Sequence, residues 1–260
     1  MTIYSKQIRR ESEFRQILGI RFFVGDAQQA IDLVRNGGLL VVPAAPALKN
    51  LSDDPAYREA LLGADVAIAD SSLMVMVWNF MQKDRIRRLS GLEYLVELLA
   101  QPDVCEPRAV FWIMANPVGA AKNLAWLKQK GIDVLPQDVY LAPVYGSSIE
   151  DEALLAQVRE RKPRHIVVAI GGGTQERLGL YLKQHVASRP AIHCIGAAIA
   201  FLSGDQVRIP MWADRFYLGW LFRCLSEPKR FVPRYWSARK LIGLMLRYRG
   251  LLPAPLAKQA

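Results

Sequence analysis

The chain of 260 residues is 52% hydrophobic and 22% charged, a composition that excludes a disordered or fibrous protein. Its three cysteines, Cys105, Cys194 and Cys224, lie far apart. This spacing excludes a disulfide scaffold and a zinc module and indicates a reducing compartment. Residues 1–14 lack the apolar core of a signal peptide, and no stretch reaches the ~18 apolar residues that span a bilayer. We therefore expect a cytoplasmic protein that is soluble or peripheral to a membrane.

Short apolar runs alternate with amphipathic helical patterns along most of the chain. The runs predict strands buried on both faces of a parallel sheet, at Leu39–Pro43, Val66–Asp70, Ala109–Met114, Asp133–Pro136, His165–Gly171 and Ala191–Gly196. Helices are predicted between them, at Ala27–Asn36, Pro55–Leu62, Ser72–Gln82, Leu92–Leu99, Val118–Lys130, Ile149–Arg161 and Gln175–His185. This alternation is typical of a Rossmann-like α/β fold, in which a mainly parallel sheet carries helices on both faces.

The net charge of +10 is concentrated at the C-terminus. Residues 206–260 contain 11 of the 34 Lys and Arg residues but only 2 of the 24 Asp and Glu residues, so they carry a charge of +9. We therefore divide the chain near residue 206 into an α/β body, residues 1–205, and a basic C-terminal appendage, residues 206–260. Such a segment can contact nucleic acid, an anionic membrane surface or a phosphorylated ligand.

Two short amphipathic helices are predicted in the appendage, at 216–225 and 236–249, with breaks around Pro228 and Pro233. Helices that combine an apolar face with Arg and Lys lie in a lipid interface rather than cross it. The alternative is that the apolar faces pack on the protein's own core and the charges are solvated. Both interpretations stay open for 216–225, whereas membrane contact is favoured for 236–249 because it lies close to the terminus.

Asp70 is the first candidate for chemistry, because it ends a predicted strand and ligands of a doubly wound sheet bind at the carboxyl ends of its strands. A carboxylate at that edge can take a proton from a substrate hydroxyl. Alternatively, Asp70 is the N-cap of the helix that follows. Its position alone favours the N-cap.

Three consecutive glycines, Gly171, Gly172 and Gly173, follow another predicted strand and precede a helix. Such glycines let the backbone approach a ligand closely, and a helix N-terminus favours an anion such as a diphosphate. The alternative is a tight turn in which Thr174 caps the helix. The spacing matches neither the dinucleotide-binding nor the P-loop pattern, but the triple glycine favours contact with a ligand.

Metal ligands are not indicated by the sequence. It contains no Asp-x-Asp, and His165, His185 and His193 show no metal-ligand spacing. We therefore expect neither a metal ion nor a cofactor. His165 and His193 lie at buried strands and are interpreted as structural.

Four segments together resemble one family: VAIADSS, RRLSGLEYL, VVAIGGGTQERL and the stretch from Gly204 to Trp236. The last segment is the most specific, because matching residues occur at Gly204, Arg208, Pro210, Trp220, Arg223, Pro228, Arg230, Arg234 and Tyr235. Over residues 20–240 the sequence is similar to the WecG/TagA/CpsF glycosyltransferases. The resemblance implies a Rossmann-like body with a basic C-terminal appendage, in a bacterial enzyme peripheral to the inner membrane.

The activity implied by the resemblance is inverting, metal-independent transfer of a sugar from a UDP-sugar to a polyprenyl-diphosphate-linked sugar in cell-surface polysaccharide synthesis. In the family's pattern Asp70 is the catalytic base, which reverses the preference for an N-cap. Substrate-binding residues beside the three glycines are implied at Arg88, Gln175, Glu176, Arg223, Arg230 and Arg234. The last three of these are expected to meet the diphosphate.

Several positions depart from the family's pattern. Pro43 and Ala45 stand in place of a Thr-x-Asn motif, Ala200 in place of an Asp, and Gly219 in place of a Glu. The family's Gly-x-Pro-Lys-Gln-Glu reads Gly-Gly-Gly-Thr-Gln-Glu in this chain. Because each lost polar group is a lost hydrogen bond to the ligand, these departures indicate either a changed sugar specificity or a loss of activity.

The same departures leave a second function open, that of a non-catalytic UDP-sugar-binding or scaffold protein of a polysaccharide assembly complex. Nucleic-acid binding is much less favoured, because the basic segment comes with no reading module or stacking platform. Self-association into a homo-oligomer is a further expectation, since a basic protein with apolar patches can pair through them.

Overall fold

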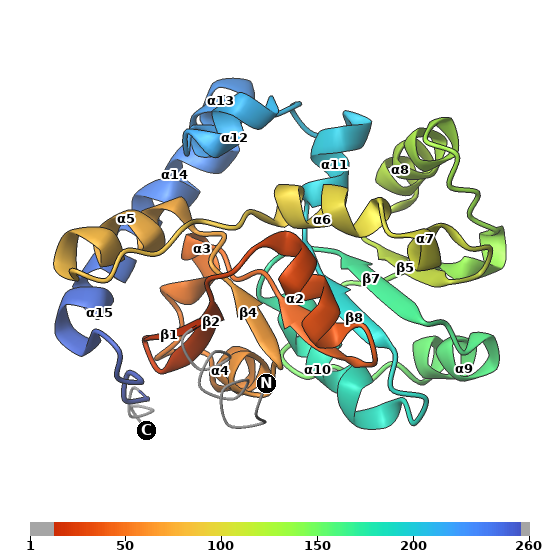
Figure 1. Cartoon of the computed structure of the whole chain (residues 1–260), viewed down its shortest axis with the longest axis horizontal. Helices are drawn as coiled ribbons and strands as arrows, with labels where there is room; N and C mark the ends of the chain where they lie inside the picture. Colours follow the sequence, from red (N-terminus) through yellow and green to blue (C-terminus); the bar gives the residue numbers. More distant parts are fainter. Residues whose placement is uncertain (1–12, 256–260) are drawn as a thin grey trace, which may run out of the picture.

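The structure, a computed structural model, describes residues 13–255. The predicted lack of a signal peptide concerns residues 1–14 and therefore falls almost entirely outside the described residues, as does Lys258 of the predicted appendage. In Figure 1 the sheet lies at the centre, and the C-terminal helices run along one side of the molecule beside α5 (Ser72–Met81).

Eight strands form one sheet in the order β1-β2-β4-β3-β8-β7-β5-β6. All neighbouring strands are parallel except β1 and β2, which pair antiparallel at one edge. The strands are β1 (Phe14–Ile17), β2 (Ile20–Phe23), β3 (Gly38–Val41), β4 (Val66–Ile68), β5 (Val110–Met114), β6 (Val139–Leu141), β7 (His165–Ala169) and β8 (Ala191–Cys194). The predicted α/β fold with a mainly parallel sheet is confirmed.

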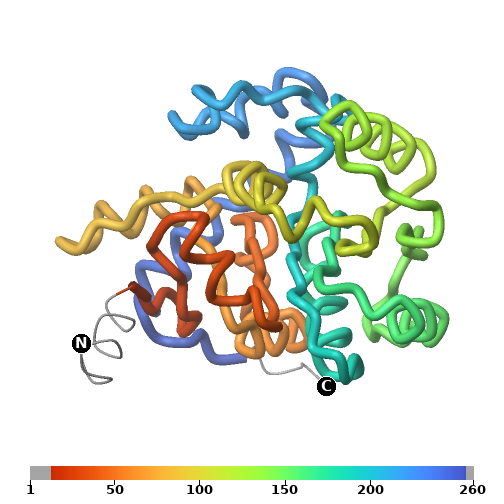
Figure 2. Tube along the Cα trace, turned by 45° about the vertical axis from the view of Figure 1, so that its right-hand side comes forward, coloured from red at the N-terminus to blue at the C-terminus, as the bar shows by residue number. Residues whose placement is uncertain are grey.

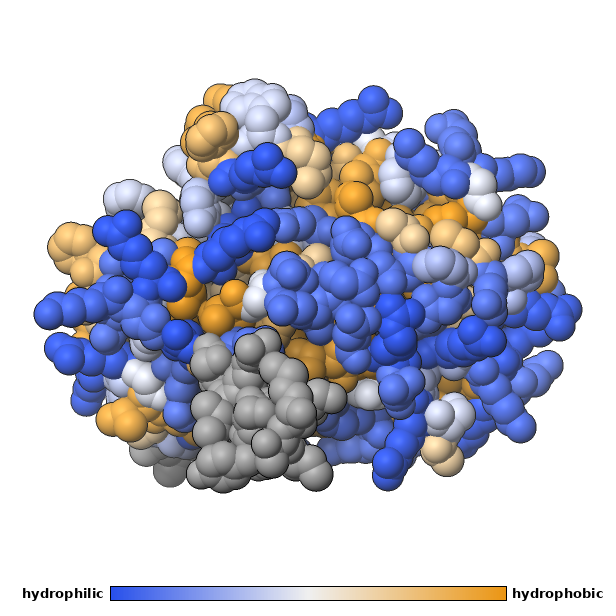
Figure 3. All heavy atoms as spheres, in the orientation of Figure 1, coloured by the Kyte–Doolittle hydropathy of each residue, from blue (hydrophilic) through white to orange (hydrophobic). Residues whose placement is uncertain are grey.

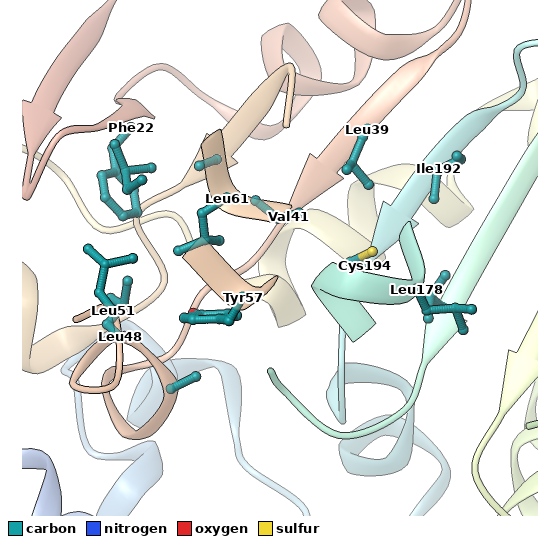
Figure 4. Close-up of a cluster of buried hydrophobic side chains, with 14 of the residues drawn as sticks. Phe22, Leu39, Val41, Leu48, Leu51, Tyr57, Leu61, Leu178, Ile192 and Cys194 are labelled. Atoms are coloured by element: carbon teal, nitrogen blue, oxygen red, sulfur yellow. The ribbon is translucent and has the colours of Figure 1, made fainter. Parts of the chain in front are cut away.

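Side chains alternate between the two faces of the sheet, as the pleat of a strand requires. In β3, Leu39 and Val41 join one core and Leu40 joins the other. The first core, part of which is shown in Figure 4, packs under α3 (Ala45–Leu48), α4 (Pro55–Leu62), α5, α9 (Glu152–Arg161), α10 (Thr174–His185) and α15 (Lys240–Tyr248). The second packs under α2 (Ala27–Val34), α6 (Gly91–Leu99), α7 (Pro102–Cys105), α8 (Pro117–Gln129) and α11 (Ala198–Ser203).

The strand predicted at Asp133–Pro136 is misplaced. Pro136 instead begins a 3-10 turn, Pro136–Asp138, and the edge strand β6 follows it. The reason is that proline has no N–H to donate to a ladder, whereas the residues of β6 pair with β5. The apolar pattern also misses β1 and β2, because β1 mixes polar residues into a short edge strand.

The C-terminal segment forms α12 (Met211–Arg215), α13 (Gly219–Ser226), α14 (Pro228–Ala238) and α15, and Figure 2 shows its path in blue. The predicted break at Pro228 is present, since Pro228 begins α14. The predicted break at Pro233 is wrong, because α14 continues through it. A proline removes one backbone hydrogen bond, and packing of α14 on α3 with Phe231 buried offsets that loss.

The apolar face of residues 236–249 lies in the protein's own core. Leu241 and Met245 of α15 are fully buried against the first core, so the prediction that this face is free for a membrane is wrong for these two residues. After α15 the chain pairs with the β1–β2 turn, where Leu18 and Gly19 donate their amides to the carbonyls of Arg249 and Gly250. α15 is thereby fixed at both its face and its end.

Two buried histidines form part of a polar chain between β8 and α7. His193 Nδ1 lies 2.7 Å from the Tyr94 hydroxyl, and His193 Nε2 lies 3.1 Å from His165 Nδ1. His165 Nε2 in turn lies 3.4 Å from Asp103. Burial, and to a smaller extent the neighbouring His165, lowers the pKa of His193 to about 3. Both rings are thus neutral hydrogen-bonding groups of the core.

We predict that His193→Gln reduces the loss of stability in mild acid. The unfolded chain binds a proton at His193 below its ordinary pKa of 6.5, whereas the folded chain does not until about pH 3, so stability falls as the pH falls through this window. At about pH 5 this difference costs about 2 kcal/mol. Urea unfolding at about pH 7 and about pH 5 measures it.

His185→Gln is the control, because His185 is exposed on α10. The change in unfolding free energy between the two pH values should be about 2 kcal/mol smaller in His193→Gln than in His185→Gln. Equal changes in the two variants would contradict a neutral, buried His193.

Candidate active site

The carboxyl ends of the parallel strands border a pocket of about 560 Å³, the place where doubly wound sheets bind ligands. One side is formed by the segments that follow β3, β4, β5, β7 and β8, and the other by α13 and α14. Most of the predicted site residues line it: Asp70, Arg88, Gly171, Gly172, Gln175, Arg223, Arg230 and Arg234. Gly173 and Glu176 do not line it.

Asp70 lies where the strand pattern places it, but it is not a helix cap. Val66 and Ile68 of β4 face the second core, and the period of two carries Asp70 to the same side. The N-cap of α5 is Ser71, whose side chain accepts a hydrogen bond from the Met74 amide. The carboxylate of Asp70 is therefore left for other partners.

Arg88 is the main partner of Asp70. Its Nε donates to the Asp70 carbonyl oxygen at 2.6 Å, and its Nη2 lies 3.2 Å from Asp70 Oδ1. The amide of Gly91 donates to the same Oδ1 at 3.1 Å. Within residues 13–255, Oδ2 of Asp70 accepts no hydrogen bond, and the side chain is 25% exposed to the pocket. One oxygen is thus held while the other stays accessible.

Asp214, on α12, holds Arg88 from the opposite side. Arg88 Nη2 lies 2.9 Å from Asp214 Oδ1, and Nη1 donates to the Asp214 carbonyl oxygen at 2.7 Å. The Ser90 hydroxyl donates to Asp214 Oδ2 at 2.5 Å. Burial opposes the charge of Arg88, but the two carboxylates outweigh it and raise the pKa of Arg88. Sequence reasoning missed Asp214, although it is one of two acids in a strongly basic segment.

Three arginines form a positive wall across the pocket. Arg223 lies with its guanidinium 4.3 Å from the centre of the Phe201 ring, and its Nη1 donates to the Tyr235 hydroxyl at 3.2 Å. Its buried Nε has no partner within the described residues. Desolvation lowers the pKa of Arg234, and the charges of Arg223 and Arg230 lower it further. Cations gathered this closely indicate a site for an anion.

The glycine turn, residues 171–173, leads into α10. Gly173, with a φ of +92°, is the N-cap, so the alternative in which Thr174 caps the helix is wrong. Glu176 is buried under the turn, and its carboxylate accepts the Gly173 amide at 2.6 Å and the Gln175 side-chain amide at 3.2 Å. Burial raises the pKa of Glu176 to about 7, although these hydrogen bonds act to lower it. Glu176 therefore shapes the turn and does not contact the pocket.

Comparison with known proteins identifies the family of the chain. A family model described as "Glycosyl transferase WecG/TagA/CpsF family" matches residues 15–253, nearly the whole of the described chain. The chain belongs to this family. It is therefore a glycosyltransferase, and the resemblance noted in the sequence is confirmed.

Two curated relatives bear the same name, N-acetylglucosaminyldiphosphoundecaprenol N-acetyl-beta-D-mannosaminyltransferase. The one from Bacillus spizizenii is 26% identical over 79% of this chain and 80% of the relative. The one from Staphylococcus aureus is 23% identical over 82% of this chain and 85% of the relative. Both matches thus cover most of each protein.

Three of the positions that depart from the family's pattern lie in the pocket of this glycosyltransferase. Ala45, Ala200 and Gly219 all line it, whereas Pro43 does not. Ala45 and Ala200 are buried and offer no hydrogen bond where the family's pattern has Asn and Asp. At these two positions the side chains offer a ligand apolar contact only.

We predict that Asp214→Ala destabilises the glycosyltransferase by about 3 kcal/mol, because removal of one partner leaves a buried charge poorly compensated. The side chains of Arg88 and Asp214 are 13% and 9% exposed, so water replaces the lost carboxylate incompletely. Urea unfolding measures the change.

Asp84→Ala is the matched control, since Asp84 pairs with Arg15 at an exposed site. An exposed pair contributes about 1 kcal/mol or less. If the two alanine variants lost the same stability, the ion pair between Asp214 of α12 and Arg88 would contribute no more than an exposed ion pair.

Proposed function

We propose that this glycosyltransferase transfers a sugar from a UDP-sugar to a polyprenyl-diphosphate-linked sugar, with inversion and without a metal ion, at a membrane surface. The observation that carries the proposal is that two features lie on opposite sides of one pocket. One is the Asp70 carboxylate, which has one accessible oxygen, and the other is the wall of Arg223, Arg230 and Arg234. The names of both relatives support the acceptor class, since each specifies a sugar diphosphate linked to undecaprenol.

Asp70 acts as the general base in the proposed reaction. Its Oδ2 accepts the proton of the acceptor hydroxyl, while Arg88 and the Gly91 amide hold Oδ1 in place. The acceptor oxygen then forms a bond to the anomeric carbon as the bond from that carbon to the UDP oxygen breaks. Attack from the face opposite UDP inverts the anomeric centre in one step.

The leaving UDP carries away the electron pair and develops negative charge, which must be stabilised in the transition state. Guanidinium groups suit phosphate oxygens because their donors form a planar fork. The arginine wall and the N-terminus of α10 supply this positive potential. These groups give metal-independent transfer a physical basis.

The decisive prediction concerns Asp70→Asn, which keeps the side chain's shape but removes the base. In wild type we expect UDP release from one member of a panel of UDP-sugars, dependent on a short-chain polyprenyl-diphosphate-GlcNAc analogue and unaffected by EDTA. In Asp70→Asn the rate should fall at least about 100-fold. UDP binding, measured by calorimetry, should persist, because the arginine wall is unchanged.

A wild-type rate in Asp70→Asn would remove Asp70 as the base. UDP binding without turnover on any donor of the panel would instead favour the non-catalytic UDP-sugar-binding or scaffold function. Loss of turnover on addition of EDTA would contradict metal independence.

We also propose that residues 206–260 serve as the membrane-facing appendage. Within residues 13–255 no helix has the length and apolarity to cross a bilayer. Large apolar side chains are nonetheless exposed around α5 and α12–α14: Phe80, Trp212, Phe216, Trp220, Leu225 and Trp236. Figure 3 shows orange, hydrophobic surface among the polar surface at this end of the molecule. Aromatic side chains beside Arg and Lys are typical of surfaces that enter an anionic lipid interface.

Substitution tests this surface better than deletion, because deletion of 206–260 would strip Phe231, Leu241 and Met245 from the core. Phe216 and Trp236 are 70% and 67% exposed. We predict that Phe216→Ser combined with Trp236→Ser weakens binding to vesicles with anionic lipid at least about tenfold, since each ring loses its apolar burial in lipid. Vesicle sedimentation measures the change.

Leu62→Ser is the control, because Leu62 is half-exposed at the end of α4 and belongs neither to α5 nor to residues 206–260. It should sediment with vesicles as the wild type does. Equal sedimentation of the double variant and Leu62→Ser would show that another surface meets the membrane.

A further inference from the structure

Beside the active-site pocket lies a smaller cavity of about 320 Å³, here called the side cavity. It shares Pro46, Gly171, Gly172 and Arg234 with the pocket. The rest of its polar lining comes from α4, the segment before it, and α14: Lys49, Asn50, Asp54, Tyr57 and Ser237. The reaction proposed above uses none of these five residues, so the side cavity needs an explanation of its own.

The side cavity has an excess of positive charge. Lys49 Nζ lies 3.0 Å from Ser237 Oγ, a contact that fixes the ammonium at the cavity wall. Neither Lys49 nor Arg234 pairs with a carboxylate in the described part of the chain. The one lining acid, Asp54, is occupied as the N-cap of α4, where it accepts the Tyr57 amide at 2.9 Å. Two unpaired cations in a cavity attract an anion.

The glycine turn adds backbone donors. The amides of Gly172 and Thr174 form no hydrogen bond within residues 13–255, as expected at the first turn of a helix. A Cβ added at Gly171, Gly172 or Gly173 would meet no atom within 4 Å. The turn therefore faces open space instead of packing against protein, and a ligand can reach its backbone.

Tyr57 is an independent observation that points to a ligand of the side cavity. It lines the side cavity, is 1% exposed, and its hydroxyl has no partner among the described residues; Figure 4 shows its ring beside Leu61. Burial, with the charges of Glu176 and Asp54, raises the pKa of Tyr57 well above its usual value, so the hydroxyl keeps its proton. An unpaired buried donor costs about 1–3 kcal/mol, which a ligand oxygen would recover.

We propose that the side cavity is a second anion subsite that takes a phosphoryl group, separate from the diphosphate of the sugar nucleotide in the main pocket. Lys49 and Arg234 neutralise its charge, and the free amides of the turn donate to its oxygens. Arg234 lines both spaces and couples them electrostatically. The inference rests on the proposed function only in assigning the main pocket to the nucleotide.

Calorimetric titration of pyrophosphate into the full-length protein, saturated with UDP, tests the subsite. Pyrophosphate should bind to the UDP-saturated wild type. Lys49→Gln should weaken this binding at least about tenfold, because a charge-assisted contact is lost, and Tyr57→Phe should weaken it severalfold. Lys229→Gln is the matched control, since Lys229 lies exposed on α14 and lines neither space.

Two results would overturn the proposal: failure of pyrophosphate to bind to the UDP-saturated protein, or equal affinities in Lys49→Gln and Lys229→Gln. Thermal unfolding of the variants checks that they are folded. If UDP itself fails to bind, the proposed function fails, while Lys49-dependent binding of pyrophosphate would still establish the subsite.

Transfer assays distinguish the source of the phosphoryl group. If it belongs to the lipid-linked acceptor, Lys49→Gln raises the KM for the acceptor analogue and leaves the KM for the UDP-sugar unchanged. If it is a free phosphate ion, added inorganic phosphate changes the rate of the wild type but not that of Lys49→Gln. Either pattern supports the subsite.

Discussion

The guanidinium of Arg88 is the group on which the assembly of the candidate active site depends. Its Nη2 lies between the carboxylates of Asp70 and Asp214, and its other nitrogens bind the backbone of the same two residues. Asp214 is 126 residues away along the chain. A buried ionic cluster of this kind is stable only when its polar atoms are satisfied, and Ser90 and Gly91 supply the remaining donors. Asp70, the proposed base, is therefore positioned fully only when α12 is docked.

The pocket has opposite net charges on its two sides. The cluster of Asp70, Arg88 and Asp214 carries one net negative charge, whereas the wall of α13 and α14 carries arginines that repel one another. An anion between the arginines relieves the repulsion, and whatever binds the folded state stabilises it. Because α13 contains no buried residue, we expect the proposed nucleotide ligand to hold this helix more firmly than packing does.

A structural feature could be predicted from the sequence when it leaves a local pattern of residue types. Continuous apolar runs are visible without tertiary information, so the parallel core strands and Asp70 at the end of one of them could be predicted. The edge strand β1 carries Arg15 and Gln16 and leaves no such run. Pro233 is tolerated only because α14 packs on α3, a contact between distant segments that local rules cannot supply.

The same limit applies to the candidate site. Residues that match a motif of the family can be predicted from the sequence, and eight of the ten predicted site residues line the pocket. Glu176 matches the motif, yet its carboxylate is buried under the glycine turn. Asp214 contacts Arg88, and Lys49 contacts Ser237; both partners lie far away along the chain. Such contacts become visible only once the fold is known.

The glycine turn borders the side cavity and is also one of the segments that depart from the family's pattern. Gly173 and Thr174 stand where the family's pattern has Pro and Lys, so this chain lacks a positive charge on the turn itself. Lys49 and Arg234 line the cavity that the same turn borders. Positive charge is thus present beside the turn, contributed by α14 and by the residue that follows α3. Because electrostatic attraction depends on distance and burial and not on position in the chain, the proposed phosphoryl subsite at this edge of the sheet does not require a positive charge on the turn itself.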